Sequence, residues 1–171
     1  MALQLLSVLT DKGTPNTFMQ LTRAADYAVR VMIHLAGLPQ GARVSRGDLS
    51  IAADCPEQFL AKVLQNLTRA GLVISHRGNT GGFELEEARR SASVLDVVEA
   101  VEGPLRLNIC LTSDHACCRQ AWCPAHNVWQ DAQDAMLGVL GQARIDALAI
   151  TAAERRLVLD TPVLIEEPQW T

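Results

Sequence analysis

The sequence contains few aromatic residues and no long apolar segment. Phe, Trp and Tyr make up 4% of its 171 residues, which argues against a surface that stacks single-stranded bases. It has no run of eighteen or more apolar residues, so we expect no membrane-spanning helix. The first residues, MALQLLSVLTDKG, also lack the basic segment and the small-residue cleavage site of a signal peptide. We therefore expect a cytoplasmic protein.

Common catalytic signatures are missing as well. The chain has no GxGxxG motif, no P-loop and no recognisable Cys–His–acid constellation, so we do not expect an enzyme. Apolar residues make up 49% and charged residues 20% of the sequence, which suffices for a buried core. The length fits one average domain, or a small domain with an oligomerisation arm.

The charge is unevenly distributed along the chain. The net charge is −4, but residues 19–90 carry nine basic and seven acidic side chains, whereas residues 91–171 carry five basic and eleven acidic ones. A mildly basic half joined to an acidic half is typical of a DNA-binding module that carries a regulatory region.

Residues 19–90 show the element order of a winged helix-turn-helix. Helical periodicity begins after Thr22, a candidate N-cap, and Ser45 is expected to cap a shorter helix over 46–53. Pro56 suits the first position of a third helix, which ends before Gly71. Its predicted apolar stripe consists of Phe59, Leu60, Val63, Leu64 and Leu67. Strands predicted over 72–76 and 83–85 flank a glycine-rich turn and form the wing.

The remaining segments are assigned by their periodicity. Ser93 and Asp96 predict an imperfect capping box for a helix over 94–102. Residues 91–126 are therefore expected to contain this linking helix, followed by a loop with four cysteines. Residues 127–150 form one long helix, amphipathic over 128–149, which we expect to pack on a second subunit. Residues 151–171 are interpreted as a tail, and residues 1–18 as an extension before a candidate start at Met19. The expected fold class is mainly α with a small β-hairpin wing.

Six side chains are candidates for DNA contacts. Gln can pair with adenine, and Lys or Arg with guanine or phosphate, when a helix lies in the major groove. The polar stripe of the third helix offers such donors, Arg46 begins the second helix, and the arginine at the hairpin tip could occupy the minor groove. The candidates are Gln58, Lys62, Gln65, Arg69, Arg77 and Arg46. The alternative is a solvated helix face and a solvated turn.

Four of the five cysteines lie within fourteen residues, in the pattern C-x6-C-C-x4-C-P-A-H. The spacing matches neither a zinc ribbon nor a bacterial ferredoxin. Thiolates select iron–sulfur clusters, zinc or copper(I), so the loop predicts a metal or redox function. Free or oxidisable cysteines in a surface loop are the alternative. Cys55, outside the loop, is interpreted as a small apolar residue, and His34 as packed or solvated.

Three segments resemble the NsrR/IscR/RirA (Rrf-two) family of bacterial iron–sulfur regulators. They are MQLTRAADYAVRVMIHLA at 19–36, LAKVLQNLTRAGLVISHRGNTGGFEL at 60–85 and SVLDVVEAVEGP at 93–104. The resemblance covers about residues 19–149. It implies a homodimer that binds a palindromic double-stranded promoter site, and a cluster of the 2Fe-2S or 4Fe-4S type.

The resemblance also implies the cluster ligands. They are Cys110, Cys123 and one of the middle pair, with Cys117 preferred over Cys118 because of its interval to Cys123. Asp26 stands where NsrR-like nitric oxide sensors have an aspartate that reaches the partner subunit's cluster, and His126 stands where IscR-like regulators have a histidine. We favour Asp26, although an ion pair with Arg30 would also explain it.

The functional expectation is a dimeric transcription regulator, a repressor that senses nitric oxide or redox and iron status. The alternatives are a cluster-free thiol switch or zinc-dependent regulator of the same fold, and an IscR-like sensor of cluster supply.

Overall fold

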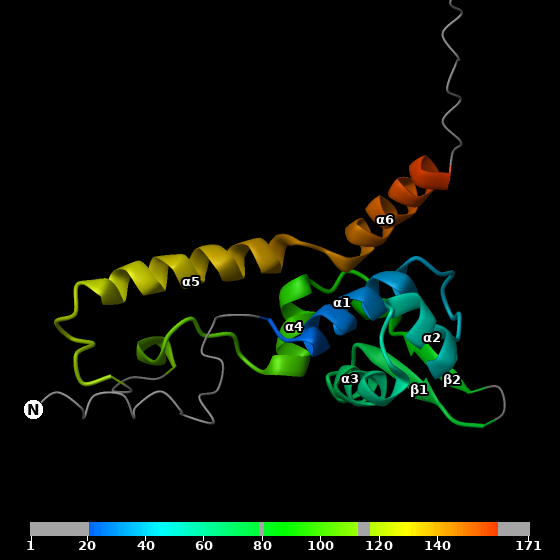
Figure 1. Ribbon diagram of the computed structural model, residues 1–171, viewed down its shortest axis with the longest axis horizontal. Coiled ribbons are helices and arrows are strands. Elements are labelled where there is room, and N and C mark those ends of the chain that lie inside the picture. The colour runs from blue at the N-terminus through cyan, green and yellow to red at the C-terminus, as the bar shows by residue number, and fades with distance from the viewer. Residues whose placement is uncertain (1–20, 79–80, 113–116, 161–171) are drawn as a thin grey trace, which may run out of the picture.

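The computed structural model describes residues 21–78, 81–112 and 117–160. The predicted extension at 1–18, the candidate start at Met19 and the tail from residue 161 onward lie outside these residues. Figure 1 shows a small helical body with a two-stranded hairpin, from which a long helix extends to one side. No helix in the described ranges combines the length and the hydrophobicity that a membrane span requires.

The body is a winged helix-turn-helix, as the sequence predicts. Its helices are α1 (Arg23–Ala36), α2 (Arg46–Ala53) and α3 (Glu57–Arg69). The antiparallel strands β1 (Val73–His76) and β2 (Gly82–Leu85) form the wing, and the short 3-10 helix η1 (Glu87–Arg89) follows. Val44 joins the hairpin as a third partner: the Val44 N–H donates to the Phe83 carbonyl at 3.0 Å, and the Val44 carbonyl accepts from the Phe83 N–H at 2.8 Å.

Local capping fixes where the helices begin. The side chains of Thr22 and Ser45 accept hydrogen bonds from the backbone N–H groups of Ala24 and Asp48, which satisfies donors that a helix end leaves free. The capping box of α4 (Val94–Glu102) is complete: Ser93 accepts from the Asp96 N–H, and the Asp96 carboxylate accepts from the Ser93 N–H. Pro56 is the N-cap of α3 and not its first residue, so the helix begins at Glu57, one residue later than predicted.

The core forms where α1 packs against α2, α3 and α4. Leu60, Val63, Leu64 and Leu67 of α3 are at most 2% exposed. Phe59, predicted in the same apolar stripe, is 59% exposed, so that part of the prediction is wrong. It lies about 100° around the helix from Leu60, at the margin of the buried face, which the four aliphatic side chains already fill.

The C-terminal half contains the short 3-10 helix η2 (Ile109–Leu111) and two helices, α5 (Ala125–Gln142) and α6 (Ile145–Asp160). The prediction of one continuous helix over 128–149 is therefore wrong. Ala143 is extended, its carbonyl accepts the Val94 N–H at 2.8 Å, and the Ile145 N–H donates to the Ala92 carbonyl at 2.9 Å. Ile145 is 0% exposed in the core, so two backbone bonds and a buried side chain stabilise the break.

The break turns α6 back onto α1, whereas α5 leads away from the body (Figure 1). The first ten residues of the predicted tail, 151–160, belong to α6 and correct that boundary. The described part of the cysteine loop, with η2, lies at the end of α5 far from the wing. The chain thus places its wing and the described cysteines of the loop at opposite ends of the molecule.

Candidate functional site: the surface of α3 and the cysteine loop

One side of α3 is polar and exposed, and the other side is buried. Gln58, Lys62, Gln65 and Arg69 are all exposed to solvent, at the helical spacing that the sequence predicts. The buried leucines on the opposite side fix the helix against the core. The structure therefore presents four predicted DNA-contact residues as one outward-facing row.

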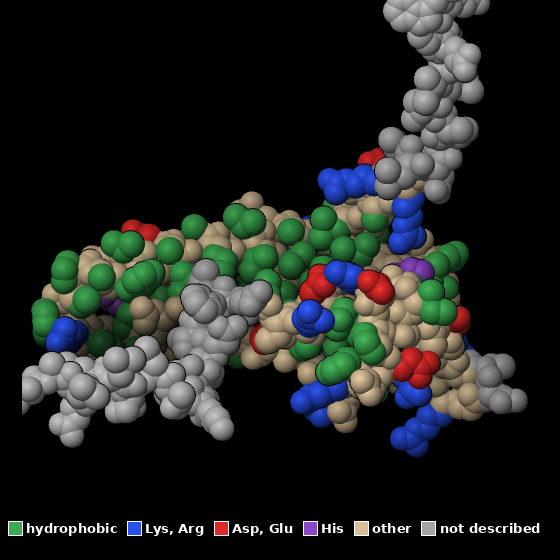
Figure 2. Space-filling model, in the orientation of Figure 1, with side chains coloured by type: hydrophobic (Ala, Val, Ile, Leu, Met, Phe, Trp, Pro, Cys, Tyr) green, Lys and Arg blue, Asp and Glu red, His purple; other side chains and the backbone are tan. Residues whose placement is uncertain are grey.

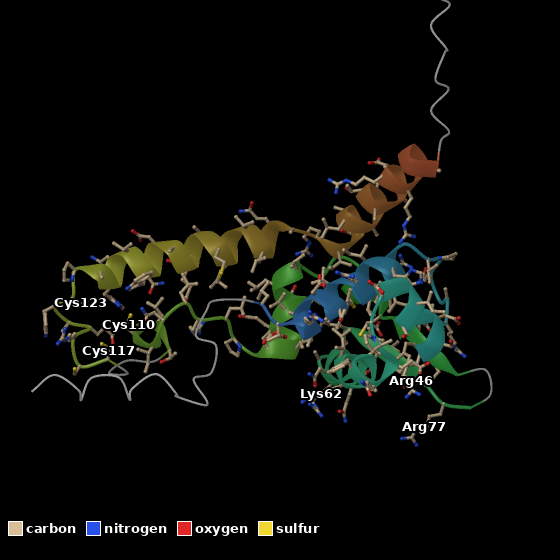
Figure 3. The ribbon with its side chains drawn as sticks, viewed as in Figure 1. Arg46, Lys62, Arg77, Cys110, Cys117 and Cys123 are labelled. Atoms are coloured by element: carbon tan, nitrogen blue, oxygen red, sulfur yellow. The ribbon has the colours of Figure 1, made fainter. Side chains whose placement is uncertain are left out.

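Arg46 and Arg77 extend this surface from neighbouring elements. Figure 3 shows Arg46, Lys62 and Arg77 pointing away from the body at the same edge of the winged helix. Arg46 and Gln58 also line one open hollow of about 470 Å³ between α2 and α3. All six predicted DNA-contact residues are exposed, and they come from two helices and the hairpin.

The charged side chains of this surface form only long, solvent-exposed contacts with other side chains in the described part of the chain. Arg46 lies 3.5 Å from the Glu57 carboxylate, with both side chains 53% exposed, and Arg69 donates to Asn66 at 3.4 Å. No ion pair of Lys62 or Arg77 is present in the described part of the chain. Exposed ion pairs of this kind contribute little, so these cations are free to contact phosphate or base edges.

The wing depends on glycine at its turn. A Cβ at Gly81 would lie 2.4 Å from the His76 carbonyl oxygen, and a Cβ at Gly82 would lie 2.7 Å from that of Val44. Gly78 has φ +101°, a conformation that residues with a Cβ rarely adopt. These glycines hold the hairpin close to the Val44 segment and place Arg77 at the outer end of β1.

Phe59 is a surface residue that sequence reasoning missed. It is 59% exposed on α3, between Gln58 and the following turn that carries Lys62. An apolar side chain in this position can contact a thymine methyl group. The sequence could have indicated that Phe59 is exposed, because helical spacing places it far around α3 from the centre of the aliphatic stripe.

The cysteine loop brings its thiols to the N-terminal end of α5. Figure 3 shows Cys110, Cys117 and Cys123 together at this end of the molecule. Cys110 is buried within η2, Cys117 and Cys123 are half-buried, and Cys118 is exposed. The residues that the structure describes contain no group of three or more His, Cys, Asp or Glu side chains arranged to hold a metal ion.

Hydrogen bonds organise the loop around these cysteines. The Gln120 N–H donates to the Cys117 carbonyl at 3.1 Å, and the Cys123 N–H donates to the Arg119 carbonyl at 2.9 Å. The Leu107 N–H donates at 3.2 Å to the side chain of Gln133 on α5, which is 6% exposed. Gln133 is thus a positioning residue for the segment before Cys110, and its place among alanines on α5 gave no signal of that role.

The two candidates for a fourth ligand lie in different places. Asp26 is on α1, 54% exposed, and its carboxylate lies 2.7 Å from the Arg30 guanidinium. His126 is in the first turn of α5, and its N–H donates to the Cys123 carbonyl at 3.1 Å. Its buried Nδ1 has no hydrogen-bond partner in the described part of the chain. The structure therefore places His126, and not Asp26, beside the cysteines of the same chain.

Two residues outside the loop have the surroundings that the sequence predicts. Cys55 is 3% exposed within the core, and burial raises the pKa of its thiol. His34 is half-buried on α1, and burial, followed by the nearby charge of Arg156, lowers the pKa of its imidazole. Neither residue is placed among the loop cysteines.

Comparison with known proteins identifies the family. The Rrf2 family, described as iron-dependent transcriptional regulators, matches residues 21–150. A proposed HTH-type transcriptional regulator of Mycobacterium tuberculosis (strain H37Rv) is 42% identical over 87 residues, which cover 51% of this chain. The chain spans about half the length of that relative, 54%.

Two solved structures share the fold. The crystal structure of Staphylococcus aureus CymR is 25% identical, with a TM-score of 0.59, and the match covers 75% of this chain and 96% of that one. The structure of T. potens IscR is 23% identical, with a TM-score of 0.62, and covers 83% and 93% respectively. Since the family match includes more than half of the sequence, this chain belongs to the Rrf2 family, a family of winged-helix, DNA-binding transcriptional regulators and not of enzymes.

Proposed function

We propose that this protein is a dimeric repressor that senses nitric oxide or redox and iron status through an iron–sulfur cluster. The observation that carries the proposal is the gathering of Cys110, Cys117 and Cys123 at one end of α5 in a chain whose other end presents a basic DNA-facing surface. The iron-dependence in the family's description agrees with this donor set.

DNA recognition would use α3 in the major groove and the wing beside it. Gln58, Lys62 and Gln65 supply amide and ammonium donors for base edges, and Arg69 continues the row along α3. Arg77 would contact the minor groove or the backbone, and Arg46 would contact phosphate from the start of α2. The surface comprises two helices and a hairpin, which is the docking geometry of a helix-turn-helix protein.

A second subunit would cover the apolar side of α5. Val128 is 62% exposed, Val139 is 70% exposed and Trp129 is 42% exposed, and Figure 2 shows hydrophobic side chains along this helix. Apolar side chains at helical spacing on an extended arm are suited to an isologous contact with the same helix of a second copy. The resulting two-fold axis would match a palindromic site.

Three thiolates would hold the cluster. The proposed ligands are Cys110 from η2, Cys123 before α5, and Cys117, which is more buried than the exposed Cys118. The thiol donor set fits iron–sulfur chemistry, although these residues do not form a complete metal site within one chain. A bound cluster would supply iron that reacts with nitric oxide or oxygen, or that is lost under iron shortage.

The fourth ligand would complete the site from a different element. Asp26 of the partner subunit is our first choice, because α1 lies in the winged-helix body and would bring a carboxylate across the dimer. His126 is favoured as the alternative by its unpartnered, buried Nδ1 beside Cys123. The two assignments differ in whether the ligand crosses between subunits.

The ligand contact between the cluster of one subunit and Asp26 of the partner subunit would couple the state of the cluster to DNA binding. Asp26 is four residues before Arg30 on α1, and α1 packs directly against α2 and α3. A tie between the loop of one subunit and α1 of the other would fix the distance between the two recognition helices. Half-site spacing is a geometric requirement, so loss of the tie would release the DNA.

A cluster-free thiol switch or a zinc site is the second candidate function. Cys117 and Cys118 are adjacent, and Cys118 is exposed, so oxidation could act on this pair without a metal. An IscR-like sensor of cluster supply, with His126 as ligand, differs from the main proposal in its effector.

Iron and acid-labile sulfide analysis after anaerobic purification, combined with a promoter-DNA titration at fixed salt, tests the proposal. Cys123→Ala should abolish both cluster content and site-specific DNA binding. Cys118→Ala is the matched control and should retain both. Protein that is free of iron and sulfide when purified without air, yet binds its promoter undiminished, would refute the proposal.

A further inference from the structure

A cavity of about 380 Å³ lies where α6 meets α1 and the end of α2. Part of its wall is apolar. Ile33 of α1 and Leu38 just after α1 form one side, and small side chains of α6, namely Ala149, Ala152 and Ala153, form the other. The remaining polar side chains are Arg30, His34 and Arg156. A volume of this size falls within the range of about 300–1,000 Å³ that small-molecule sites occupy.

The charged side chains that line this cavity in the described part of the chain all have the same sign. No Asp or Glu is among these described lining residues, although the chain as a whole has a net charge of −4. Arg30 contacts the Asp26 carboxylate and donates to the Ala53 carbonyl at 3.3 Å, but its guanidinium has five N–H donors and retains capacity. Arg156 forms no ion pair within the described residues.

The pKa of His34 depends on the burial and the positive charge in the same cavity. Burial and the positive charge of Arg156 lower the pKa of its imidazole from the usual 6.5. His34 is therefore neutral near pH 7, and the two guanidinium groups are the fixed charges. Two guanidinium groups on an apolar wall are suited to an anionic group attached to an apolar body.

We propose that this cavity binds a small organic anion, whose carboxylate or phosphate group pairs with Arg30 and Arg156 and whose apolar part contacts the alanines of α6. Such a ligand joins α6 to the winged helix, because Arg30 is on α1 and Arg156 is on α6. None of the loop cysteines lines this cavity, but Arg30 also contacts Asp26, the proposed fourth cluster ligand.

Nuclear magnetic resonance titration of the full chain with matched probes tests this proposal. Benzoate and phenyl phosphate carry the two anionic groups, benzyl alcohol is the neutral match, and benzylamine is the cationic match. At constant ionic strength and pH 7, at least one of the two anions should cause saturable chemical-shift changes at the backbone amides of Gly37, Ala152 and Ala153. The stronger anion identifies the preferred acidic group. Benzyl alcohol and benzylamine should bind at least about tenfold more weakly, as expected for the loss of a charge-assisted contact.

A pair of neighbouring arginines on α6 provides the control. Arg156→Gln should weaken binding of the preferred anion by about tenfold, because glutamine keeps the helix and removes only the charge. Arg155→Gln, at an exposed position outside the cavity, should leave the affinity unchanged. The proposal is overturned if neither anion gives saturable shifts, if benzyl alcohol binds as well as the anions, or if both variants have equal effects.

Discussion

In the winged helix, Leu60, Leu64 and Leu67 of α3 are at most 1% exposed. Arg90 donates at 2.8 Å each to the carbonyl of Ala36, the last residue of α1, and to that of Leu38 just after it. In the cysteine half, Val139 of α5 is 70% exposed and the buried Nδ1 of His126 has no partner in the described residues. In the first region the aliphatic core of α3 and the end of α1 find their partners within one chain, although Ile51 and Phe59 are exposed and the buried Thr68 hydroxyl has no partner in the described residues. The second leaves both kinds of group available, which is the condition expected of a surface that binds a second subunit and an inorganic ligand.

The largest effect should come from the core of the winged helix. Leu64→Ala should lower the free energy of unfolding by about 2–5 kcal/mol, because it leaves a cavity among fully buried side chains. Val139→Ala on exposed α5 should change it by less than about 0.5 kcal/mol at a protein concentration low enough for monomers. Denaturant unfolding of both variants measures the contrast, and equal losses would remove the distinction between the two regions.

A charge on α5 should change assembly and leave the winged helix folded. Val139→Glu should convert the dimer to monomer, since an interface core excludes an unpaired carboxylate. Gln130→Glu, on the opposite side of α5 by helical spacing, is the matched control and should remain dimeric. Sedimentation analysis with circular dichroism reads both properties. A Val139→Glu variant that stays fully dimeric would place the interface elsewhere.

Substitutions on the proposed DNA-binding surface should weaken DNA binding without lowering the stability of the fold. Lys62→Ala and Arg77→Ala should each weaken promoter binding by about 1–3 kcal/mol if the side chain contacts a base, or lower the salt dependence by about one charge if it contacts phosphate. Arg155→Ala, a basic residue on α6, is the control for general charge. Fluorescence anisotropy over a salt series distinguishes these cases, and an unchanged affinity and slope in both variants would contradict the assigned surface.

The smallest effect concerns the capping box of α4. Hydrogen bonds from Ser93, first its side chain and then its backbone, hold the pKa of Asp96 below the usual 3.8. A lowered carboxyl pKa contributes stability above the unfolded-state pKa, and this contribution is lost as the pH falls through the folded-state pKa. Ser93→Ala should cost about 1 kcal/mol near pH 7, and its difference from wild type should shrink as the pH falls below 3.8.

Unfolding at several pH values measures that difference. Ser91→Ala, at an exposed position beside the box, serves as the control. A Ser93→Ala cost that stays constant from neutral to acid pH would show that the carboxylate does not contribute.

Much of the winged helix was predictable because its signals are local. The caps at Thr22, Ser45 and Ser93, and the leucine spacing of α3, involve residues within one or two turns of each other. The six candidate DNA-contact side chains are exposed, and helical spacing alone places four of them in one row; their contact with DNA stays a prediction. The role of Gln133 was not predictable, because its partner at Leu107 is 26 positions away.

The sequence by itself therefore determined the helix starts, the hairpin and the polar row of α3, because short-range hydrogen bonds and side-chain periodicity specify them. Only the tertiary structure decided that the chain breaks at Ala143, that α6 turns back to α1, and that Arg30 and Arg156 line one cavity. These features depend on contacts between distant segments, such as the bond from Val94 to Ala143 and the burial of Ile145. The energy of such contacts comes from packing across the fold, which a local pattern of residues does not encode.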